Sequence, residues 1–351
     1  MSEQVRAPRQ RPPAMTDVAQ LAGVSHQTVS RVLNDHPSVR PDTRDRVMSA
    51  IEVLGYRPNS AARILVTGRS EVLGVISFDT TLYGPASTVY GIERAAREAG
   101  YFVSIASLPA LDVESVREAA DRLIAQSVAG IMIVAPLMSA AEAITTLPSN
   151  LPVVLVQGGP ETGAPEVIVD HESGARQAVE HLLGLGHATV WHVTGPDGWI
   201  ESNARLAGWR AALAAAGAKV PAPLVGDWSA RSGYLAGRRL ARLRSVTAIF
   251  AANDQMSLGI LRAMHEVGRR VPEDVSIVGF DDIPEAAYLT PPLTTIRQDF
   301  AEVGRRSLNL MLSQLASGTR MDARLVVPAQ IVIRRSTMPP RDPAAPPRPP
   351  S

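Results

Sequence analysis

The sequence predicts two folds in one chain: an all-α headpiece near the N-terminus and an α/β core built from two parallel-sheet subdomains. Between residues 16 and 54, apolar side chains recur at helical spacing in three short stretches separated by Gly and Pro. Between residues 72 and 337, short β-branched runs alternate with Ala/Leu/Arg-rich stretches of helical length. This alternation is typical of parallel sheets covered by helices on both faces.

Composition limits the class of protein. The 351 residues are 45% hydrophobic, which is enough to build several domain cores. No run approaches the roughly 18 apolar residues of a membrane span, and the first residues lack the apolar centre of a signal peptide. We therefore expect a soluble cytoplasmic protein. Because Cys is absent, disulfides, thiolate metal sites and a cysteine nucleophile are excluded.

Charge is unevenly distributed along the chain. Residues 1–63 hold nine Arg and six acidic residues, a net of +3, whereas the whole chain carries +1, so the rest carries −2. A basic segment ahead of an acidic body suits nucleic-acid binding. Charge alone does not distinguish this from chance on so short a segment.

The same patterns divide the chain into five segments. Both ends are expected to be disordered, because the first 14 residues contain three Pro and the last 13 contain seven. From the N-terminus the segments are a lead (1–14), a helical headpiece (15–58), a short helix with its linker (59–69), the α/β core (70–338) and a Pro-rich tail (339–351).

The first headpiece helix is predicted to begin at Thr16 and Asp17, both good capping residues. It places Val18, Leu21 and Ala22 on one face by their i, i+3 and i+4 spacing. The glycine that follows ends the helix. A turn then leads into the next element.

The second helix is predicted to start at His26 with Ser25 as its cap, and to turn Val29, Val32 and Leu33 inward. Two short helices joined by such a turn have the spacing of a helix-turn-helix. We therefore expect the remaining face of the second helix to be free for recognition.

The third helix is predicted to follow Pro41, with Val47, Ile51 and Leu54 inward and Gly55 as its stop. The apolar faces of the three helices are sufficient to close one small core.

The outward face of the second helix carries side chains suited to base edges: His26, Gln27, Ser30, Arg31 and Asn34. Arg pairs with guanine and Gln with adenine in the major groove. Side chains suited to phosphates flank this face: Thr16, Ser25, Thr28 and Arg44. The alternative is that all of these are ordinary solvated residues of a small helical domain.

Two runs, MTDVAQLAGVSHQTVSRVLN and TRDRVMSAIEVLGYRPN, resemble the DNA-binding signature of the lactose repressor family of bacterial transcriptional regulators. The resemblance implies that residues 25–31 head a recognition helix, with His26, Gln27 and Arg31 reading the major groove of operator DNA. Where this chain has His26, the lactose repressor itself has a tyrosine. Operator preference is expected to differ at that contact.

The segment NSAARILV, from Asn59, is predicted to form a two-turn helix. A helix this short is unstable alone, so it needs a support such as DNA. In the family the matching segment is a hinge helix that enters the minor groove in pairs. There Leu65, with Ala62 beside it, matches the leucine that wedges between base pairs. The alternative is a passive linker.

Polar residues follow several of the predicted core strands: Asp79, Gln157, Asn253, Asp254 and Asp281. Ligands of open parallel sheets bind at the carboxyl ends of the strands. The stretches GDWSARSG, AANDQMSLG, VSIVGFDD and PPLTTIRQDF extend the resemblance, which lies nearer to the lactose repressor than to the family at large. It implies a core like that of periplasmic sugar-binding proteins, with chain crossings between subdomains near residues 169, 298 and 327.

The resemblance also implies an effector site in the cleft. Arg205, Asn253 and Asp281 match family residues that bind ligand hydroxyls, and Trp228 matches the aromatic residue against a galactoside ring. The remaining positions of the expected site are Leu82, Gln157, Gln298 and Phe300. The lactose repressor has an aspartate at the position of Gln157, which leaves galactoside recognition open.

Enzyme motifs are incomplete. His171-Glu172 begins like a zinc-binding helix motif, but Ala175 stands where the second His must fall. Gly184 and Gly186 lack the third glycine of a dinucleotide loop, and no G-x-S-x-G occurs. We expect no catalytic residues, no metal and no cofactor.

These observations predict a repressor associated with the nucleoid and released from pseudo-palindromic operator DNA by a small sugar, such as a galactoside or related saccharide. Paired hinge helices require a homodimer, and the Leu-free tail does not supply the leucine-heptad helix that makes the lactose repressor a tetramer. Three alternatives are a corepressor-dependent regulator of the same family, a sugar-binding protein without a DNA-linked role, and a carbohydrate-acting enzyme.

Overall fold

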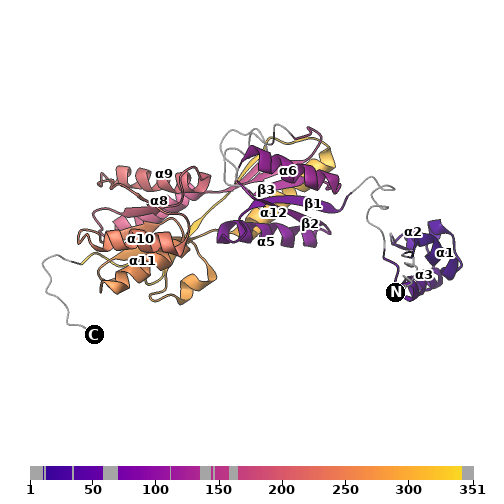
Figure 1. Ribbon diagram of the computed structural model, residues 1–351, viewed down its shortest axis with the longest axis horizontal. Helices are drawn as coiled ribbons and strands as arrows, with labels where there is room; N and C mark the ends of the chain where they lie inside the picture. Colours follow the sequence, from indigo (N-terminus) through magenta and orange to yellow (C-terminus); the bar gives the residue numbers. More distant parts are fainter. Residues whose placement is uncertain are drawn as a thin grey trace, which may run out of the picture. The chain divides into compact units, whose positions relative to one another are not determined.

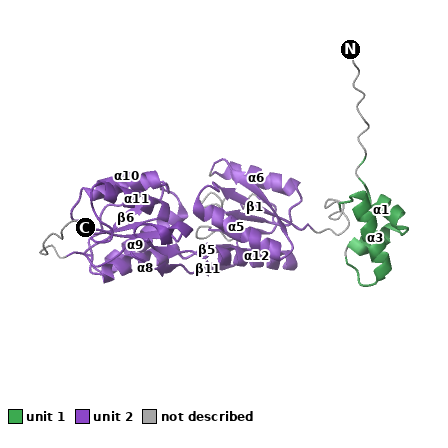
Figure 2. Ribbon diagram, turned by 90° about the horizontal axis from the view of Figure 1, so that it is seen from below, with its two compact units in different colours: residues 1–69 green, residues 70–351 purple. Residues whose placement is uncertain are grey.

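The computed structural model divides into two compact units, Met1–Arg69 and Ser70–Ser351 (Figure 2). The residues that it describes are 11, 13–33, 35–57, 70–110, 112–134, 144, 147–157 and 165–341. Four predicted DNA contacts lie outside the described residues, as do most of the expected lead and tail: Asn34, Asn59, Ala62 and Leu65.

The first unit contains the three predicted helices, α1 (Met15–Ala22), α2 (His26–Leu33) and α3 (Pro41–Leu54). The start of α1 was predicted wrongly by one residue. Ala14 is the N-cap, and its backbone N–H donates to the Asp17 carboxylate at 2.7 Å. Asp17 therefore caps from the third helical position, where a carboxylate reaches back to the backbone that precedes the helix.

The headpiece core is closed by all three helices. Val18, Val29 and Val47 are fully buried there. The prediction for Leu21 was wrong, because its side chain is 52% exposed and Ala19 faces the core instead. With 3.6 residues per turn, Leu21 lies roughly 100° from the centre of the stripe that α1 buries, so its side chain is directed away from the core.

The second unit is built on two six-stranded sheets. The first has the order β11-β5-β4-β3-β1-β2 and the second the order β12-β10-β9-β8-β6-β7. Figure 1 labels β1, β2 and β3 of the first sheet. The strands of the first sheet are β1 (Val72–Phe78), β2 (Phe102–Leu108), β3 (Ile131–Val134), β4 (Val153–Val156), β5 (Glu166–Val169) and β11 (Arg324–Val327). Those of the second are β6 (Trp191–Thr194), β7 (Leu224–Val225), β8 (Ala248–Ala251), β9 (Ser276–Asp281), β10 (Thr294–Arg297) and β12 (Gln330–Val332).

Neighbouring strands in the described part of both sheets are parallel, except that β12 runs antiparallel to β10. The first sheet is covered by α5 (Tyr83–Glu98), α6 (Val113–Ala125) and α12 (Phe300–Ser317). The second is covered by α8 (His171–Gly184), α9 (Ile200–Ala215), α10 (Ala230–Ala241) and α11 (Asp254–Glu266), and a 3-10 turn (Pro284–Tyr288) follows β9. We call each sheet with its helices a subdomain. The predicted fold class, a helical headpiece and a core of two parallel-sheet subdomains, is confirmed.

Helices pack on both faces of each sheet, and the strand residues alternate accordingly. In β3, Met132 and Val134 join the cluster that contains residues of α5 and α12, whereas Ile131 and Ile133 join the cluster that contains residues of α6. Both sides are apolar because both faces are buried. This explains why the strands read as continuous apolar runs in the sequence.

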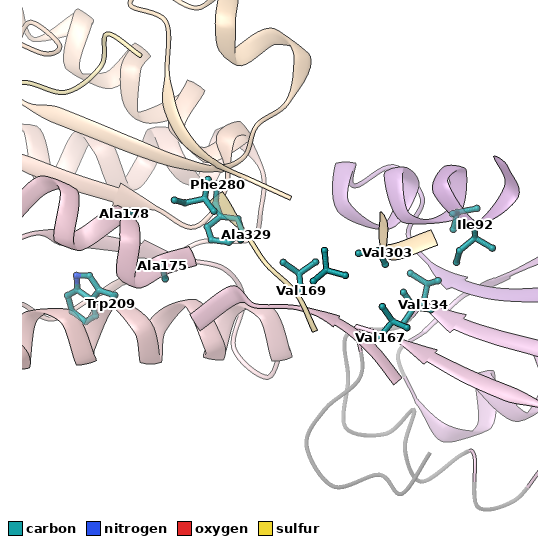
Figure 3. Close-up of a cluster of buried hydrophobic side chains, with 14 of the residues drawn as sticks. Ile92, Val134, Val167, Val169, Ala175, Ala178, Trp209, Phe280, Val303 and Ala329 are labelled. Atoms are coloured by element: carbon teal, nitrogen blue, oxygen red, sulfur yellow. The ribbon is translucent and has the colours of Figure 1, made fainter. Parts of the chain in front are cut away.

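The chain passes between the subdomains three times: from β5 to α8, from β10 to α12, and from β11 to β12. A buried apolar cluster follows these crossings. Figure 3 shows it running from Ile92 and Val303 in the first subdomain through Val169 to Ala175 and Phe280 in the second. The crossings therefore share a hydrophobic core.

None of the helices in the described part of the chain has both the length and the apolar character needed to span a bilayer.

Candidate functional site

The outward face of α2 displays the side chains that were predicted to read DNA. His26, Gln27 and Arg31 are exposed, whereas Val29 and Val32 are buried against the other two helices. Ser30 is half-buried beside them. The amphipathic spacing of α2 thus separates a packing face from a polar face, as the sequence indicated.

The turn before α2 is fixed by local hydrogen bonds. Gly23 has a φ of 63°, in the left-handed region that a glycine adopts without strain. Ser25 is the predicted cap, since its hydroxyl accepts from the Thr28 backbone N–H at 3.1 Å and lies 2.9 Å from the Thr28 hydroxyl. These bonds cap the first turn of α2.

Two other predicted phosphate contacts differ in their surroundings. Thr16 is exposed on the first turn of α1. The Arg44 guanidinium pairs with the Asp35 carboxylate and also donates to the His36 backbone oxygen at 3.4 Å. A phosphate at Arg44 would have to compete with Asp35 for that guanidinium.

The second unit contains a cavity lined by residues of both subdomains. All eight predicted effector-site residues belong to its lining: Leu82, Gln157, Arg205, Trp228, Asn253, Asp281, Gln298 and Phe300. Two of the polar residues that follow strands, Asp79 and Asp254, are not part of it. Asp254 instead accepts from the Thr295 hydroxyl at 2.6 Å and from the Ile283 backbone N–H at 2.9 Å.

Arg205, on the second turn of α9, is the buried cation of this cavity. Its guanidinium carbon lies 3.8 Å from the centroid of the Phe280 ring and 5.3 Å from that of Trp228. It donates to the Ala252 backbone oxygen, and its terminal nitrogen lies 3.5 Å from the Asp281 carboxylate. Stacking and pairing together offset the cost of burying the charge.

Asp281 ends β9 and is buried in the cavity wall. Burial raises its pKa to about 6, although the charge of Arg205 and a hydrogen bond from the Gln298 amide, at 2.6 Å, both act to lower it. His171 also contacts Arg205, and burial followed by the Arg205 charge lowers its pKa well below the usual value. Its imidazole is therefore neutral and accepts from Arg205 at 3.4 Å.

Trp228 provides an aromatic wall of the cavity. Its ring packs directly on the backbone of Gly195, where a side chain would collide with it. Asn253 ties the Trp228 backbone to α11, because its amide nitrogen donates to the Trp228 oxygen at 3.0 Å while its amide oxygen caps the helix at Met256 N, at 2.8 Å. Asn253 thus has one N–H left for a ligand.

Three residues of the lining adopt positive φ angles: 65° at Gln157, 71° at Trp228 and 112° at Asp281. For residues with a side chain, such angles cost of order 1–3 kcal/mol each. Backbone strain of this kind is found where the position of a side chain matters for function.

Several polar atoms of the lining are buried without a partner among the described residues. They are Glu201 Oε2, Trp228 Nε1, Gln255 Oε1 and Gln298 Oε1. Each unsatisfied group of this kind costs about 1–3 kcal/mol unless something binds to it. Three of the four are acceptors, so the cavity is suited to a ligand that brings hydrogen-bond donors.

Ten lining residues were not predicted as site residues: Thr81, Tyr83, Gly84, Pro85, Thr88, Val134, His171, Trp199, Glu201 and Gln255. His171 was weighed only as part of an incomplete zinc motif, yet it follows β5 in the same way that the predicted residues follow their strands. Glu201 lies one helical turn before Arg205, and that spacing was a usable signal.

Two family models match the chain. The model for bacterial regulatory proteins of the lacI family matches residues 14–59, and the model for the periplasmic binding protein-like domain matches residues 179–337. The first covers the headpiece, and the second covers most of the core from α8 onward.

Curated relatives match over nearly the whole chain. The lactose operon repressor of Escherichia coli (strain K12) is 37% identical over 340 residues, which are 96% of this chain and 94% of that protein. The HTH-type transcriptional regulator CelR of Thermobifida fusca is 35% identical over 342 residues, or 93% and 99% of the two chains. Both are regulators of transcription by name, which agrees with the prediction that this chain is not an enzyme.

Solved structures of transcriptional regulators are also similar to this chain. The lac repressor dimer bound to operator and the anti-inducer ONPF is 36% identical, with a TM-score of 0.87, and the match covers 93% of this chain and all of that one. The complex of the regulator CelR with cellobiose is 32% identical, with a TM-score of 0.69, over 92% and 99% of the two chains. With a matching headpiece, a matching core and relatives of this identity, the chain belongs to the lacI family of bacterial regulatory proteins.

Proposed function

We propose that this protein is a transcriptional repressor that binds operator DNA through α2 and is released when a neutral sugar binds in the cavity between the core subdomains. The observation that carries the proposal is the cavity wall. It combines the buried Arg205–Asp281 pair, the Trp228 ring and several unpartnered polar atoms. Hydroxyl groups satisfy such atoms, and the apolar face of a sugar ring fits an aromatic plate.

The DNA-binding part rests on α2. Gln27 and Arg31 lie on its exposed face, and their side chains match the donor and acceptor patterns of adenine and guanine in the major groove. Among the relatives, a lac repressor dimer bound to its operator supports a dimer here as well. A two-fold dimer would place two such helices on a pseudo-palindromic site.

The charge of the cavity favours an uncharged effector. Arg205 supplies one positive charge, but it is balanced by Asp281 and faces the carboxyl group of Glu201. No further cation lies among the described lining residues. A phosphate or carboxylate on the sugar would therefore be placed beside acidic groups without a free cation to bind it.

The relatives support a saccharide effector, although their names differ and include a ribose operon repressor and the repressor PurR. One is named for the lactose operon, and another was solved with cellobiose. We therefore favour a galactoside or a related saccharide. Gln157 keeps this choice open, because its amide oxygen accepts from the Val169 backbone N–H at 3.1 Å and is thereby partly withdrawn from the ligand.

Calorimetric titration with neutral sugars, their 6-phosphates and their uronic acids tests this function. Neutral sugars should bind to the wild-type protein, and the charged derivatives should bind about tenfold or more weakly. The Asp281→Asn variant should lose most of the affinity, because it removes the negative charge that pairs with Arg205 and replaces one carboxylate oxygen with an amide donor. Equal binding of phosphorylated and neutral sugars, or an unchanged affinity in Asp281→Asn, would refute the assignment of the cavity.

A further inference from the structure

We infer that the effector cavity continues into a second binding subsite, a side cavity between the start of α9 and strands β5 and β11, which takes a second sugar ring attached to the ring beside Trp228. This inference rests on the proposed function, because it assumes that the first ring is a sugar. It goes further in naming the ligand as a disaccharide and in placing its second ring.

The two cavities meet at shared side chains. Gln157, His171 and Glu201 line both of them. A ligand that contacts these three side chains from the main cavity thus has the side cavity directly beyond them.

Glu201 marks the junction. Its Oε2 is buried and has no partner among the described residues. Its carboxyl accepts a hydrogen bond from its own backbone N–H, whereas Arg205 and Asp281 in the main cavity act on it only through their charges. A buried acceptor without a partner at the junction is explained if a ligand hydroxyl, near the link between two rings, donates to it.

The lining of the side cavity has both an apolar part and a polar part, and a sugar ring needs both. Its apolar part comes from Ile168, Val169 and Ile200, which match the C–H face of a ring. Its polar part comes from Glu172, Asn203 and Arg324, whose side chains are exposed at the rim. Such a mixture of an apolar floor and a polar rim is typical of small-ligand sites.

Among the described residues that line the side cavity, no cation is free to bind an anionic substituent. Arg324 pairs with the Glu166 carboxylate at 2.8 Å. A neutral second ring is therefore a better occupant than a phosphate.

Filling the side cavity tests the inference. Asn203 is exposed at its rim, so Asn203→Trp occupies the space with little risk to folding. Calorimetry should compare lactose and cellobiose with their component monosaccharides, galactose and glucose. In the wild type at least one disaccharide should bind about tenfold or more tightly than its components. Asn203→Trp should remove this preference and leave monosaccharide affinity within about twofold of the wild type.

Ala207→Trp is the matched control. Ala207 is exposed on the same helix, one turn further on, and lines neither cavity. This variant should keep the disaccharide preference. Monosaccharides that bind as tightly as disaccharides, or a preference that survives Asn203→Trp, would overturn the second subsite while leaving the sugar-binding function intact. If none of the four sugars binds, both the sugar effector and the subsite are refuted.

Discussion

At the scale of single residues, the fold compensates the charge of Arg205 in the cavity but leaves several polar atoms without a partner among the described residues. Arg205 has the Phe280 ring, the Ala252 oxygen and Asp281 as neighbours, so its charge is compensated within the protein. Glu201 and Trp228 each leave a polar atom buried without a partner among the described residues. A ligand that forms hydrogen bonds with these atoms removes the cost of burying them without a partner, which favours its binding.

The recognition residues give the first prediction. Gln27→Ala and Arg31→Ala should each weaken specific operator binding by about 1–3 kcal/mol, because each removes hydrogen bonds to one base edge. Binding to random DNA should be nearly unchanged, since phosphate contacts do not depend on sequence. Fluorescence anisotropy with operator and random duplexes measures both affinities. An unchanged ratio in both variants would contradict the role of α2.

Glu201 gives a prediction about pH. Burial raises its pKa from 4.5 to about 7, so the folded protein binds this proton more tightly than the unfolded chain does. The stabilisation that results is complete below about pH 4.5 and is lost as the pH rises to about 7. Glu201→Gln carries no such proton. We compare the free energies of unfolding of Glu201→Gln and the wild type. Between pH 4.5 and a pH above 7, their difference should change by roughly 1–3 kcal/mol in favour of the variant.

Urea unfolding followed by tryptophan fluorescence measures this difference, because all four Trp lie in the core unit. Other titrating groups contribute equally to both proteins and cancel in the comparison. Parallel stability curves of the wild type and Glu201→Gln between pH 4.5 and 8 would show that Glu201 is not desolvated.

At the scale of elements, two helices of the first subdomain touch through their backbones. A Cβ at Gly304 of α12 would collide with the backbone of Gly91 in α5, and a Cβ at Gly91 would collide with that of Phe300. Phe300 begins α12 and lines the cavity. The spacing of these helices therefore helps to set the position of a cavity wall.

Gly304→Ala should destabilise the core by about 1–3 kcal/mol, because neither backbone can move aside without repacking α5 against α12. Gly184→Ala is the control. It lies at the end of α8, and nothing lies within 4 Å of the added carbon. That variant should be neutral or slightly stabilising. Equal effects of the two substitutions in urea unfolding would contradict the close contact of the helices.

The elements that the sequence predicted well are those with strong periodicity. The helices of the headpiece and the parallel strands follow from the spacing of apolar residues, which depends only on local geometry. Helix ends and single core positions depend on neighbours distant in sequence. Leu21 was therefore misassigned, and Asp17 acts from within α1 rather than before it.

Part of the cavity could also be predicted from local sequence patterns, and part could not. Residues at strand ends, such as Asn253 and Asp281, meet because parallel strands share one edge. Trp199 precedes α9, and nothing in its local pattern marks it as a cavity residue, whereas the only signal for Glu201 was its four-residue spacing from Arg205. Their place in the cavity is set by how the two subdomains pack.

At the scale of the whole molecule, the last residues should be dispensable for assembly. Thr337 and Met338 belong to the folded core, since Thr337 lies 3.0 Å from His181 Nε2 and the Met338 backbone bonds to Ser276. Truncation should therefore follow Arg341 and remove residues 342–351. That segment is rich in Pro and supplies no apolar seam for a coiled coil.

Light scattering should find a dimer for both the full chain and the truncated one, and both should bind operator equally. A tetramer that becomes a dimer on truncation would contradict this expectation.

The central claim is that a ligand in the cavity changes the affinity of α2 for DNA. The most direct test starts from the complex of the protein with labelled operator DNA. The sugar that binds most tightly is titrated into this complex while the fluorescence anisotropy of the DNA is followed. The wild type should release the DNA, because the sugar favours the arrangement of the subdomains that binds DNA weakly. Asp281→Asn should bind operator normally and keep it at the same sugar concentrations. A sugar that saturates the cavity but leaves operator affinity unchanged or tighter would contradict the account.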